Sequence, residues 1–127
     1  MEKPRILVID DEREFLNLMA EQLELGGYEV VTAINGEEGL KQIKKCSPDL
    51  VICDVKMPKK DGFEVLKEVK KDKGSQTPFL MVTAVDDFDK MKEAYAGDVD
   101  FYVTKPVKFE NLLKNIRIIL SLSKSKI

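Results

Sequence analysis

The chain of 127 residues contains no histidine and no tryptophan, and it has only two cysteines. The absence of histidine excludes a Ser-His-Asp triad, a Cys-His pair and a histidine-ligated zinc site. Any histidine that takes part in phosphate chemistry must therefore belong to a partner. Two cysteines are too few for a disulfide framework or a metal site, so we expect both to be small apolar residues, Cys53 in a buried strand and Cys46 near a helix end.

Long apolar runs and a strong excess of charge are also absent. No apolar stretch approaches the roughly 20 residues that span a bilayer, and residues 1–5 show no signal-peptide pattern, so we expect a cytoplasmic protein without a membrane partner. Basic residues number 21 and acidic residues 23, a formal charge of -2, which gives no reason to expect direct nucleic-acid binding. The length fits one domain over residues 1–127, with residues 121–127 as a tail or the start of a linker.

Short apolar runs alternate with helical patterns along the chain. The runs predict strands at residues 5–10, 28–33, 49–54, 79–82 and 100–104. Helices are predicted at residues 12–25, from an N-cap at Asn35 to just before Ser47, around 63–69, at 86–95 and around 109–120. In the first helix, the residues at helical spacing are Phe15, Leu18, Met19 and Leu23.

Five β-α units in this length predict a doubly wound α/β fold. We expect a five-stranded parallel sheet with the flavodoxin-like order 2-1-3-4-5, covered by helices on both faces as a three-layer α/β/α structure. The first and third strands would then flank the point at which the strand order reverses. Ligands bind at the carboxyl ends of the strands in such sheets, because the loops leave a crevice there.

Polar side chains follow four of the five predicted strands. Asp10 and Asp11 follow the first strand, Asp54 ends the third, Thr83 follows the fourth, and Lys105 follows the fifth. If the strands are parallel, three carboxylates, a hydroxyl and an ammonium group share one pocket at the carboxyl edge.

The composition of that pocket indicates phosphoryl transfer. Three carboxylates repel one another, so a cation is expected among them, and hard oxygen ligands suit Mg²⁺, with Mn²⁺ as a possible substitute. Lys105 supplies a second positive charge. A carboxylate flanked by a metal and a lysine is suited to act as a nucleophile that forms an acyl phosphate.

Five segments at this spacing make the chain resemble the receiver domain of two-component response regulators, in its single-domain, chemotaxis-receiver form. They are residues 7–11 (LVIDD), 51–58 (VICDVKMP), 61–62 (DG), 82–84 (VTA) and 103–106 (VTKP). Each segment is a weak signal alone, but all five in order make a strong one. The resemblance covers residues 5 to about 120.

The resemblance implies a role for each acidic residue of the pocket. Asp54 matches the aspartate that accepts a phosphoryl group from the phosphohistidine of a sensor histidine kinase or phosphotransfer protein. Asp10 and Asp11 match the acidic pair that holds Mg²⁺ together with Asp54 and the backbone carbonyl group of Lys56. Catalysis would be limited to the domain's own phosphorylation and dephosphorylation, so no other enzyme activity is expected.

The resemblance also implies a switch. Thr83 matches the hydroxyl that hydrogen-bonds the phosphoryl group, Lys105 matches the lysine that pairs with it, and the peptide bond before Pro106 is expected to be cis. Tyr102 matches the aromatic residue that moves when Thr83 moves. The surface of the helix at 86–95, the last strand and the last helix would then change and signal to an output domain or protein, and a phosphatase is a possible further partner.

Two residues differ from the common pattern and motivate hypotheses. Lys56, two residues after Asp54, is expected to weaken Mg²⁺ binding and to alter the lifetime of the acyl phosphate. Val85, two residues after Thr83, is apolar where a polar group would orient an attacking water, which predicts slow self-dephosphorylation.

Three other functions compete with this interpretation. A flavodoxin-like electron carrier needs a phosphate-binding loop after the first strand, where this chain has Asp10, Asp11 and Glu12. An aspartyl-phosphate hydrolase of the haloacid-dehalogenase type has a second Asp two residues after the nucleophile, where this chain has Lys56. A pseudo-receiver would bind partners without being phosphorylated, and the complete pocket argues against it.

Overall fold

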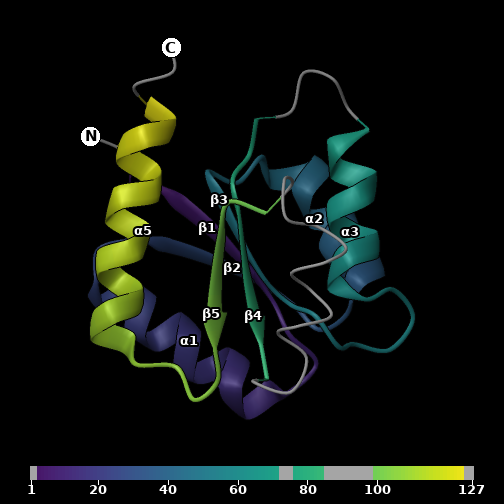
Figure 1. The fold of residues 1–127 in the computed structure, drawn as a ribbon, viewed down its shortest axis with the longest axis horizontal. Coiled ribbons are helices and arrows are strands. Elements are labelled where there is room, and N and C mark those ends of the chain that lie inside the picture. Colours follow the sequence, from purple (N-terminus) through teal and green to yellow (C-terminus); the bar gives the residue numbers. More distant parts are fainter. Residues whose placement is uncertain (1–2, 72–75, 85–98, 125–127) are drawn as a thin grey trace.

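The computed structural model describes residues 3–71, 76–84 and 99–124 (Figure 1). Along the chain the elements are β1 (Arg5–Ile9), α1 (Arg13–Leu25), β2 (Glu29–Ala33), α2 (Gly36–Cys46), β3 (Leu50–Asp54), α3 (Gly62–Lys70), β4 (Phe79–Thr83), β5 (Phe101–Thr104) and α5 (Phe109–Lys124). The helix predicted at 86–95 lies outside the described residues. None of the described helices is both long and apolar enough to span a lipid bilayer.

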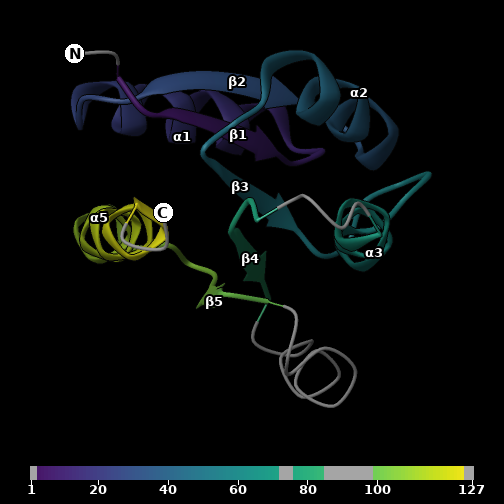
Figure 2. The same ribbon diagram turned by 90° about the horizontal axis from the view of Figure 1, so that it is seen from above.

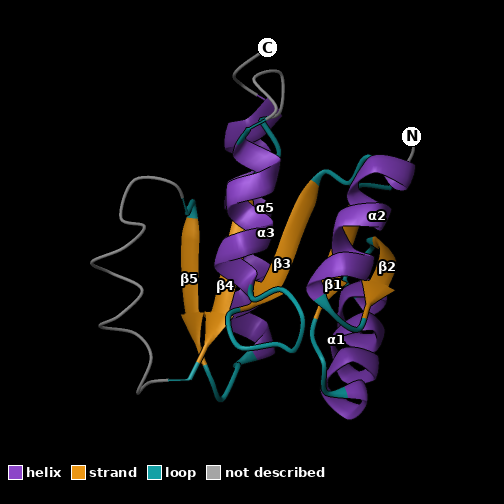
Figure 3. Cartoon of the chain, turned by 90° about the vertical axis from the view of Figure 1, so that its right-hand side faces the viewer, coloured by secondary structure: helices purple, strands orange, loops and turns teal. Residues whose placement is uncertain are grey.

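The five strands form one parallel sheet in the order β2-β1-β3-β4-β5, which confirms the predicted topology. The strands point the same way, so their carboxyl ends lie along one edge (Figure 3). All five residues of β3 and of β4 are buried, as expected for strands that are covered on both faces. In the register, Ile9 of β1 lies opposite Cys53 of β3, and Asp54 lies opposite Val82 of β4.

Helices α1 and α5 cover one face of the sheet, and α2 and α3 cover the other (Figure 2). Because successive side chains of a strand point to opposite faces, each strand contributes to two separate cores. Ile6 and Val8 pack with α1 and α5, whereas Leu7 and Ile9 pack on the face that carries α3. The structure therefore has the three predicted layers.

Helices α2 and α3 begin at capping residues in the sequence. Asn35 is the predicted N-cap of α2, and its side chain accepts a 2.9 Å hydrogen bond from the backbone N–H of Glu38. Asp61 caps α3 in the same way, and the side chain of Glu64 bonds back to the N–H of Asp61. The cap at Asp61 fixes where the loop after β3 returns to the sheet.

The core-facing stripe of α1 differs from the prediction in two residues, because it contains Leu16 in place of Leu18. Leu16, Met19 and Leu23 are buried, whereas Leu18 is 43% exposed. The prediction that Leu18 belongs to this stripe is wrong. Leu18 lies two positions after Leu16, which corresponds to a rotation of about 200° around the helix axis, so it lies on the opposite side of the helix from Leu16. Phe15 is half-buried and packs against the core shared by α1 and α5.

The last helix is longer than its apolar stripe suggested. It continues through Ser121 to Lys124, so much of the segment expected as a tail or linker start is helical. The two cysteines lie as expected: Cys53 is buried in β3, and Cys46 is half-buried at the end of α2.

Two carboxylates at the amino edge of the sheet tie neighbouring strands together. Asp49 accepts a 2.7 Å hydrogen bond from the N–H of Arg5 through Oδ2, and its own N–H donates to the carbonyl oxygen of Arg5 at 2.7 Å. Asp100 makes the same pair of bonds with Phe79, at 2.8 and 3.1 Å. We call these two pairs the amino-edge clasps. They join β3 to β1 and β5 to β4 where the strands begin.

A hollow of about 770 Å³ lies at the same amino edge, lined by Lys3, Arg5, Glu24, Tyr28, Glu29, Val30, Ser47 and Asp49. Of its charged groups, the guanidinium of Arg5 donates to Glu29 at 3.0 Å and to the carbonyl oxygen of Cys46 at 2.5 Å. Because Arg5, Glu29 and Asp49 already have protein partners, this hollow is a weaker candidate for chemistry than the opposite edge.

Candidate functional site

Three carboxylates meet at the carboxyl edge of the sheet. One oxygen each of Asp10, Asp11 and Asp54 lies within 4.8 Å of the others. Asp10 follows β1 and Asp54 ends β3, and these strands are neighbours, so the topology alone places the two side chains together. Asp10 is 1% exposed and Asp54 is 8% exposed, whereas Asp11 faces solvent. The cluster therefore has a buried floor and one carboxylate at its mouth.

Backbone contacts hold Asp10 in place. Its N–H donates to the carbonyl oxygen of Ala33 at 3.1 Å, which extends the pairing of β1 with β2 by one residue. Its Oδ1 accepts a 2.9 Å hydrogen bond from the N–H of Glu12, as in an Asx turn. The second oxygen, Oδ2, faces Lys105. The turn into α1 thus orients the carboxylate.

Asp54 is held by the close return of the loop after β3. A Cβ atom at Gly62 would lie 2.4 Å from the carbonyl oxygen of Asp54, so only glycine lets the start of α3 approach this closely. The N–H of Gly62 donates to the carbonyl oxygen of Val55 at 2.9 Å, and the thiol of Cys53 donates to the carbonyl oxygen of Asp54 at 3.4 Å. These contacts fix the backbone at Asp54.

Lys105 reaches across the pocket toward the carboxylates. Its Nζ lies 3.4 Å from Oδ2 of Asp54, 3.6 Å from Oδ2 of Asp10 and 3.9 Å from Oε1 of Glu12. The Lys105 side chain is 24% exposed. The peptide bond between Lys105 and Pro106 is cis, as the sequence resemblance implies.

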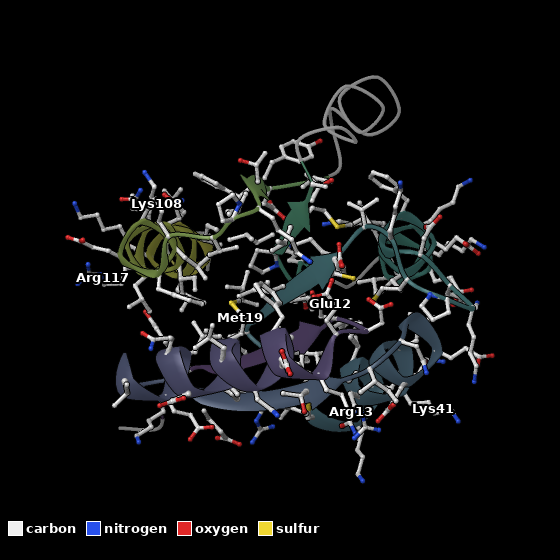
Figure 4. All side chains as sticks on the ribbon, turned by 90° about the horizontal axis from the view of Figure 1, so that it is seen from below. Glu12, Arg13, Met19, Lys41, Lys108 and Arg117 are labelled. Atoms are coloured by element: carbon white, nitrogen blue, oxygen red, sulfur yellow. The ribbon has the colours of Figure 1, made fainter. Side chains whose placement is uncertain are left out.

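An aromatic ring forms another side of the lysine site. The ammonium of Lys105 lies over the ring of Phe15, 4.6 Å from its centroid. Figure 4 looks onto the carboxyl edge and shows Glu12, which directly follows the acidic pair, beside the ends of the strands. The contacts of Phe15 and Glu12 with Lys105 were missed by sequence reasoning, because no local pattern connects the first turn of α1 with a loop about 90 residues later.

Thr83 and Tyr102 lie on the adjoining strands. Thr83 ends β4 and is fully buried, and its hydroxyl donates to the carbonyl oxygen of Ala84 at 3.2 Å. Tyr102 lies opposite Met81 in the register and is half-buried against the core on the α3 face. Lys56 is exposed on the loop after Asp54, and Val85 lies outside the described residues.

Burial and mutual repulsion make the pocket unfavourable for negative charge. Burial and, to a lesser extent, the charge of Asp10 raise the pKa of Asp54, Lys105 opposes both effects, and the resulting pKa is about 6. Burial likewise raises the pKa of Asp10. Burial alone would lower the pKa of Lys105, but the charges of Asp54 and Asp10 outweigh it and the pKa is raised.

The donor set of the pocket fits a hard divalent cation. Three carboxylates and Glu12 face a single ammonium group within the described part of the chain, so negative charge exceeds positive charge locally. Oxygen donors with open access from solvent are the ligands of Mg²⁺, which keeps several waters. Burial and the charge of Asp10 raise the pKa of Asp54 although Lys105 is near, so a bound cation would further stabilise the carboxylate form.

The fold and the pocket define a doubly wound α/β protein with an acidic, lysine-containing site at its topological switch point. Residues 6–117 match the family model of the response regulator receiver domain, and the chain belongs to that family. The prediction of the family from its five sequence segments is thereby confirmed.

Relatives come from transcriptional regulators and from isolated receiver domains. The chain is 42% identical over 117 residues to the alkaline phosphatase synthesis transcriptional regulatory protein PhoP of Bacillus subtilis, covering 91% of this chain and 48% of that protein. It is 35% identical to the DNA-binding dual master transcriptional regulator RpaA of Synechocystis, covering 92% of this chain and 49% of the relative. The chain thus spans about half the length of the curated relatives it matches.

Solved structures of receiver domains superpose on most of the chain. A response regulator receiver domain protein from Clostridium thermocellum superposes with a TM-score of 0.90 at 34% identity, covering 98% of this chain and 99% of the other. Chemotaxis response regulator CheY4 of Vibrio cholerae superposes with a TM-score of 0.84 at 33% identity, covering 93% and 99%.

Proposed function

We propose that this receiver domain is a phosphoacceptor switch and that Asp54 is the residue that accepts the phosphoryl group. The observation that carries the proposal is the position of Asp54, which is nearly buried beside Asp10 with the ammonium of Lys105 at 3.4 Å. Such a carboxylate has an ammonium group beside it that can stabilise the charge of a phosphoryl group. The donor would be the phosphohistidine of a sensor histidine kinase or phosphotransfer protein, since the chain has no histidine.

In the transfer, an oxygen of Asp54 would attack phosphorus as the bond from phosphorus to the donor's imidazole nitrogen breaks. The electron pair of that bond stays with the imidazole, which takes up a proton. Lys105 would stay close to the charge that moves onto the phosphoryl oxygens, and the hydroxyl of Thr83 would bond one of those oxygens. Hydrolysis of the acyl phosphate, unaided or with a phosphatase, would return Asp54 to its carboxylate form.

Asp10, Asp11 and Asp54 would hold Mg²⁺, or Mn²⁺ in its place, together with the backbone carbonyl group of Lys56. When bound, the metal would neutralise charge on the carboxylates and on the incoming phosphoryl group. The role of the protein is to orient the oxygens: Glu12 fixes one oxygen of Asp10 through its N–H, and Gly62 fixes the backbone of Asp54.

The output would pass through the surface of β5 and α5. A groove of about 250 Å³ runs between these elements, lined by residues that include Tyr102, Thr104, Pro106, Asn111 and Asn115. A movement of Thr83 toward the phosphoryl group would change the packing next to Tyr102 and so the shape of this groove. The helix predicted at 86–95 would complete the surface. Since several relatives are transcriptional regulators of about twice this length, the recipient would be an output domain or a separate protein.

The same features set this function apart from its competitors. A flavin phosphate would meet the carboxylates of Asp10 and Asp11 where a flavodoxin-like carrier needs neutral donors. A pseudo-receiver has no need of a buried carboxylate with a raised pKa beside a lysine. We expect the domain to act in the cytoplasm beside its kinase, to catalyse only its own phosphorylation chemistry, and to bind neither membrane nor nucleic acid itself.

Incubation with acetyl phosphate and Mg²⁺, followed by intact-mass measurement, tests the proposal. The expected result is a mass increase of one phosphoryl group that depends on Mg²⁺ and is absent in Asp54→Asn. Asp49→Asn is the matched control, because Asp49 belongs to an amino-edge clasp at the other end of β3. No mass increase in the parent protein, or the same increase in Asp54→Asn, would contradict the proposal. A yellow protein with bound flavin would favour the electron carrier.

A further inference from the structure

The ammonium group of Lys105 has two kinds of neighbour. One is a pair of carboxylates whose charge changes during the proposed reaction, and the other is an aromatic ring that stays neutral. The carboxylates of Asp54 and Asp10 lie 3.4 and 3.6 Å from Nζ. The ring of Phe15 contacts the same ammonium group, with its centroid 4.6 Å from Nζ. A cation at this distance over a phenyl face is attracted by the negative charge density of the ring.

The carboxylates cannot hold Lys105 in one place throughout the proposed reaction. When Asp54 becomes an acyl phosphate, the oxygen that contacts Nζ loses its negative charge to the phosphoryl group. A cation bound by Asp10 and Asp54 would also compete with Lys105 for the same oxygens. Glu12 is a weak substitute, because its side chain is 68% exposed and lies 3.9 Å away, where solvent screens the attraction.

The contact between Phe15 and Lys105 does not depend on a charge that changes during the reaction. Phe15 carries no charge, binds no metal and accepts no phosphoryl group, so its attraction for the ammonium stays the same before and after transfer. The attraction of a ring face is also broad, so the ammonium can slide over it by a fraction of its diameter without losing contact. A carboxylate, in contrast, favours a few directions.

The ring itself is held by the protein core. Phe15 is the third residue of α1, and it is half-buried against the cluster that α1 and α5 share. The backbone of Lys105 is anchored separately, because its N–H donates to the carbonyl oxygen of Thr83 at 2.8 Å. The ring and the backbone therefore fix both ends of the lysine side chain.

We propose that Phe15 is a positioning residue for phosphoryl transfer, which keeps the ammonium of Lys105 at the mouth of the pocket while its anionic partner changes from Asp54 to the phosphoryl group. This role rests on the proposed phosphoacceptor function. Phe15 acts through Lys105 and does not touch the reacting atoms. Loss of the ring should slow transfer by about 2- to 30-fold, which is the range that a cation–π contact of this kind supports.

A double-mutant cycle on the rate of phosphate incorporation tests this role. Phe15→Leu removes the ring but keeps an apolar side chain, and Phe15→Tyr keeps the ring. Phe109→Leu is the matched control, since Phe109 is a half-buried phenylalanine in the same core without the lysine contact. Each change is made in the parent and in Lys105→Met, and initial rates with acetyl phosphate and Mg²⁺ are measured by intact mass.

We expect Phe15→Leu to slow the parent, Phe15→Tyr to retain the rate, and Phe109→Leu to have little effect. In Lys105→Met, Phe15→Leu should cause no further loss, because the group through which it acts is gone. Equal losses in both backgrounds, or an equal loss in Phe109→Leu, would overturn the positioning role and leave the phosphoacceptor function intact. A parent protein that takes up no phosphate would overturn both.

An NMR measurement tests the contact without phosphate chemistry. The ring should shift the ε-CH₂ protons of Lys105 upfield, and this signal is assigned by its absence in Lys105→Met. Phe15→Leu should move the signal, and Phe109→Leu should not. If Phe15→Leu does not fold, Phe15→Met serves in both experiments. A signal that stays in place without the ring would overturn the proposal.

Discussion

The backbone N–H of Lys105 donates a 2.8 Å hydrogen bond to the carbonyl oxygen of Thr83. This bond continues the pairing of β4 and β5 by one residue beyond Thr104 and joins the carboxyl ends of the two strands that carry Thr83 and Lys105. A displacement of the backbone at Thr83 should therefore also move the backbone at Lys105. Thr83 and Lys105, which are both proposed to contact the phosphoryl group, are therefore expected to move together.

The stability of the metal-free protein should depend on the protonation of Asp54. Its pKa in the folded protein, about 6, exceeds that of an exposed aspartate, so the folded state binds the proton more tightly than the unfolded state. The contribution of this group is then fully present below a pH of about 4 and is lost as the pH rises through about 6. Asp54→Asn removes the buried charge and should raise the free energy of unfolding at about pH 7.5, by an amount on the order of 2 kcal/mol.

Urea unfolding in the presence of a chelator measures this effect. The gain from Asp54→Asn should shrink by about 1 kcal/mol between about pH 7.5 and about pH 5. Asp11→Asn is the control, since its carboxylate is exposed and its removal should change stability much less. A gain that is independent of pH would contradict the assignment of the raised pKa to Asp54.

Magnesium should reverse this dependence on pH. Ligands must be deprotonated to bind a metal, so Mg²⁺ should stabilise the folded protein more at neutral pH than at about pH 5. At a concentration a hundredfold above its Kd, the gain in the free energy of unfolding should be about 2.7 kcal/mol. Thermal unfolding in MgCl₂, against NaCl of equal ionic strength, measures it. The same gain in Asp10→Asn would show that Mg²⁺ binds elsewhere.

Gly62→Ala should damage both stability and phosphorylation. The added Cβ would lie 2.4 Å from the carbonyl oxygen of Asp54, so the loop or the strand must shift, at a cost of about 1–3 kcal/mol. Because the shift displaces Asp54, the rate of phosphate incorporation should also fall. Gly27→Ala is a useful comparison: Gly27 has a positive φ of 98° but open space around it, so its substitution should cost about 1 kcal/mol without affecting phosphorylation. Equal rates in Gly62→Ala and the parent would contradict the prediction.

Lys56→Asn should tighten Mg²⁺ binding. The cationic side chain of Lys56 is exposed two residues after Asp54, so it repels the metal only through solvent, and the expected gain is about two- to fivefold at low salt. The gain should fade as the ionic strength increases. Calorimetric titration and the hydrolysis rate of the acyl phosphate provide the measurements, and Lys59→Asn, three residues on, is the control. Unchanged affinity and hydrolysis would rule out the effect.

Much of the site could be predicted because the strands place it. Each apolar run ends at a definite residue, so a parallel sheet of known order brings Asp10 and Asp54 together without knowledge of any side-chain contact. The contact of Phe15 with Lys105 could not be predicted in this way. Both residues have ordinary local roles, one in a helix stripe and one after a strand, and their meeting depends on how α1 packs across the sheet.

The errors have a similar origin. Leu16 and Leu18 are equally apolar, and only the contact of α1 with the sheet decides that Leu16 is buried. Gly62 was predicted only as part of the DG segment at residues 61–62, and its close approach to Asp54 is a backbone distance that no residue pattern encodes. The sequence pattern of each helix and strand is thus sufficient to predict the topology, whereas side-chain contacts between elements become known only from the three-dimensional structure.

The amino-edge clasps fix where three strands begin, and the number of residues from each clasp then determines which residue reaches the opposite edge. Arg5 and Asp10, Asp49 and Asp54, and Asp100 and Lys105 are each separated by five positions. Segments of equal length that start from matched anchors carry Asp10, Asp54 and Lys105 the same distance across the sheet, at about 3.3 Å per residue. One residue inserted into any of them would turn its side chains to the other face and carry its charged group out of the pocket. Tolerance to insertion should therefore be lowest in these strands, even at residues that take no part in the proposed chemistry.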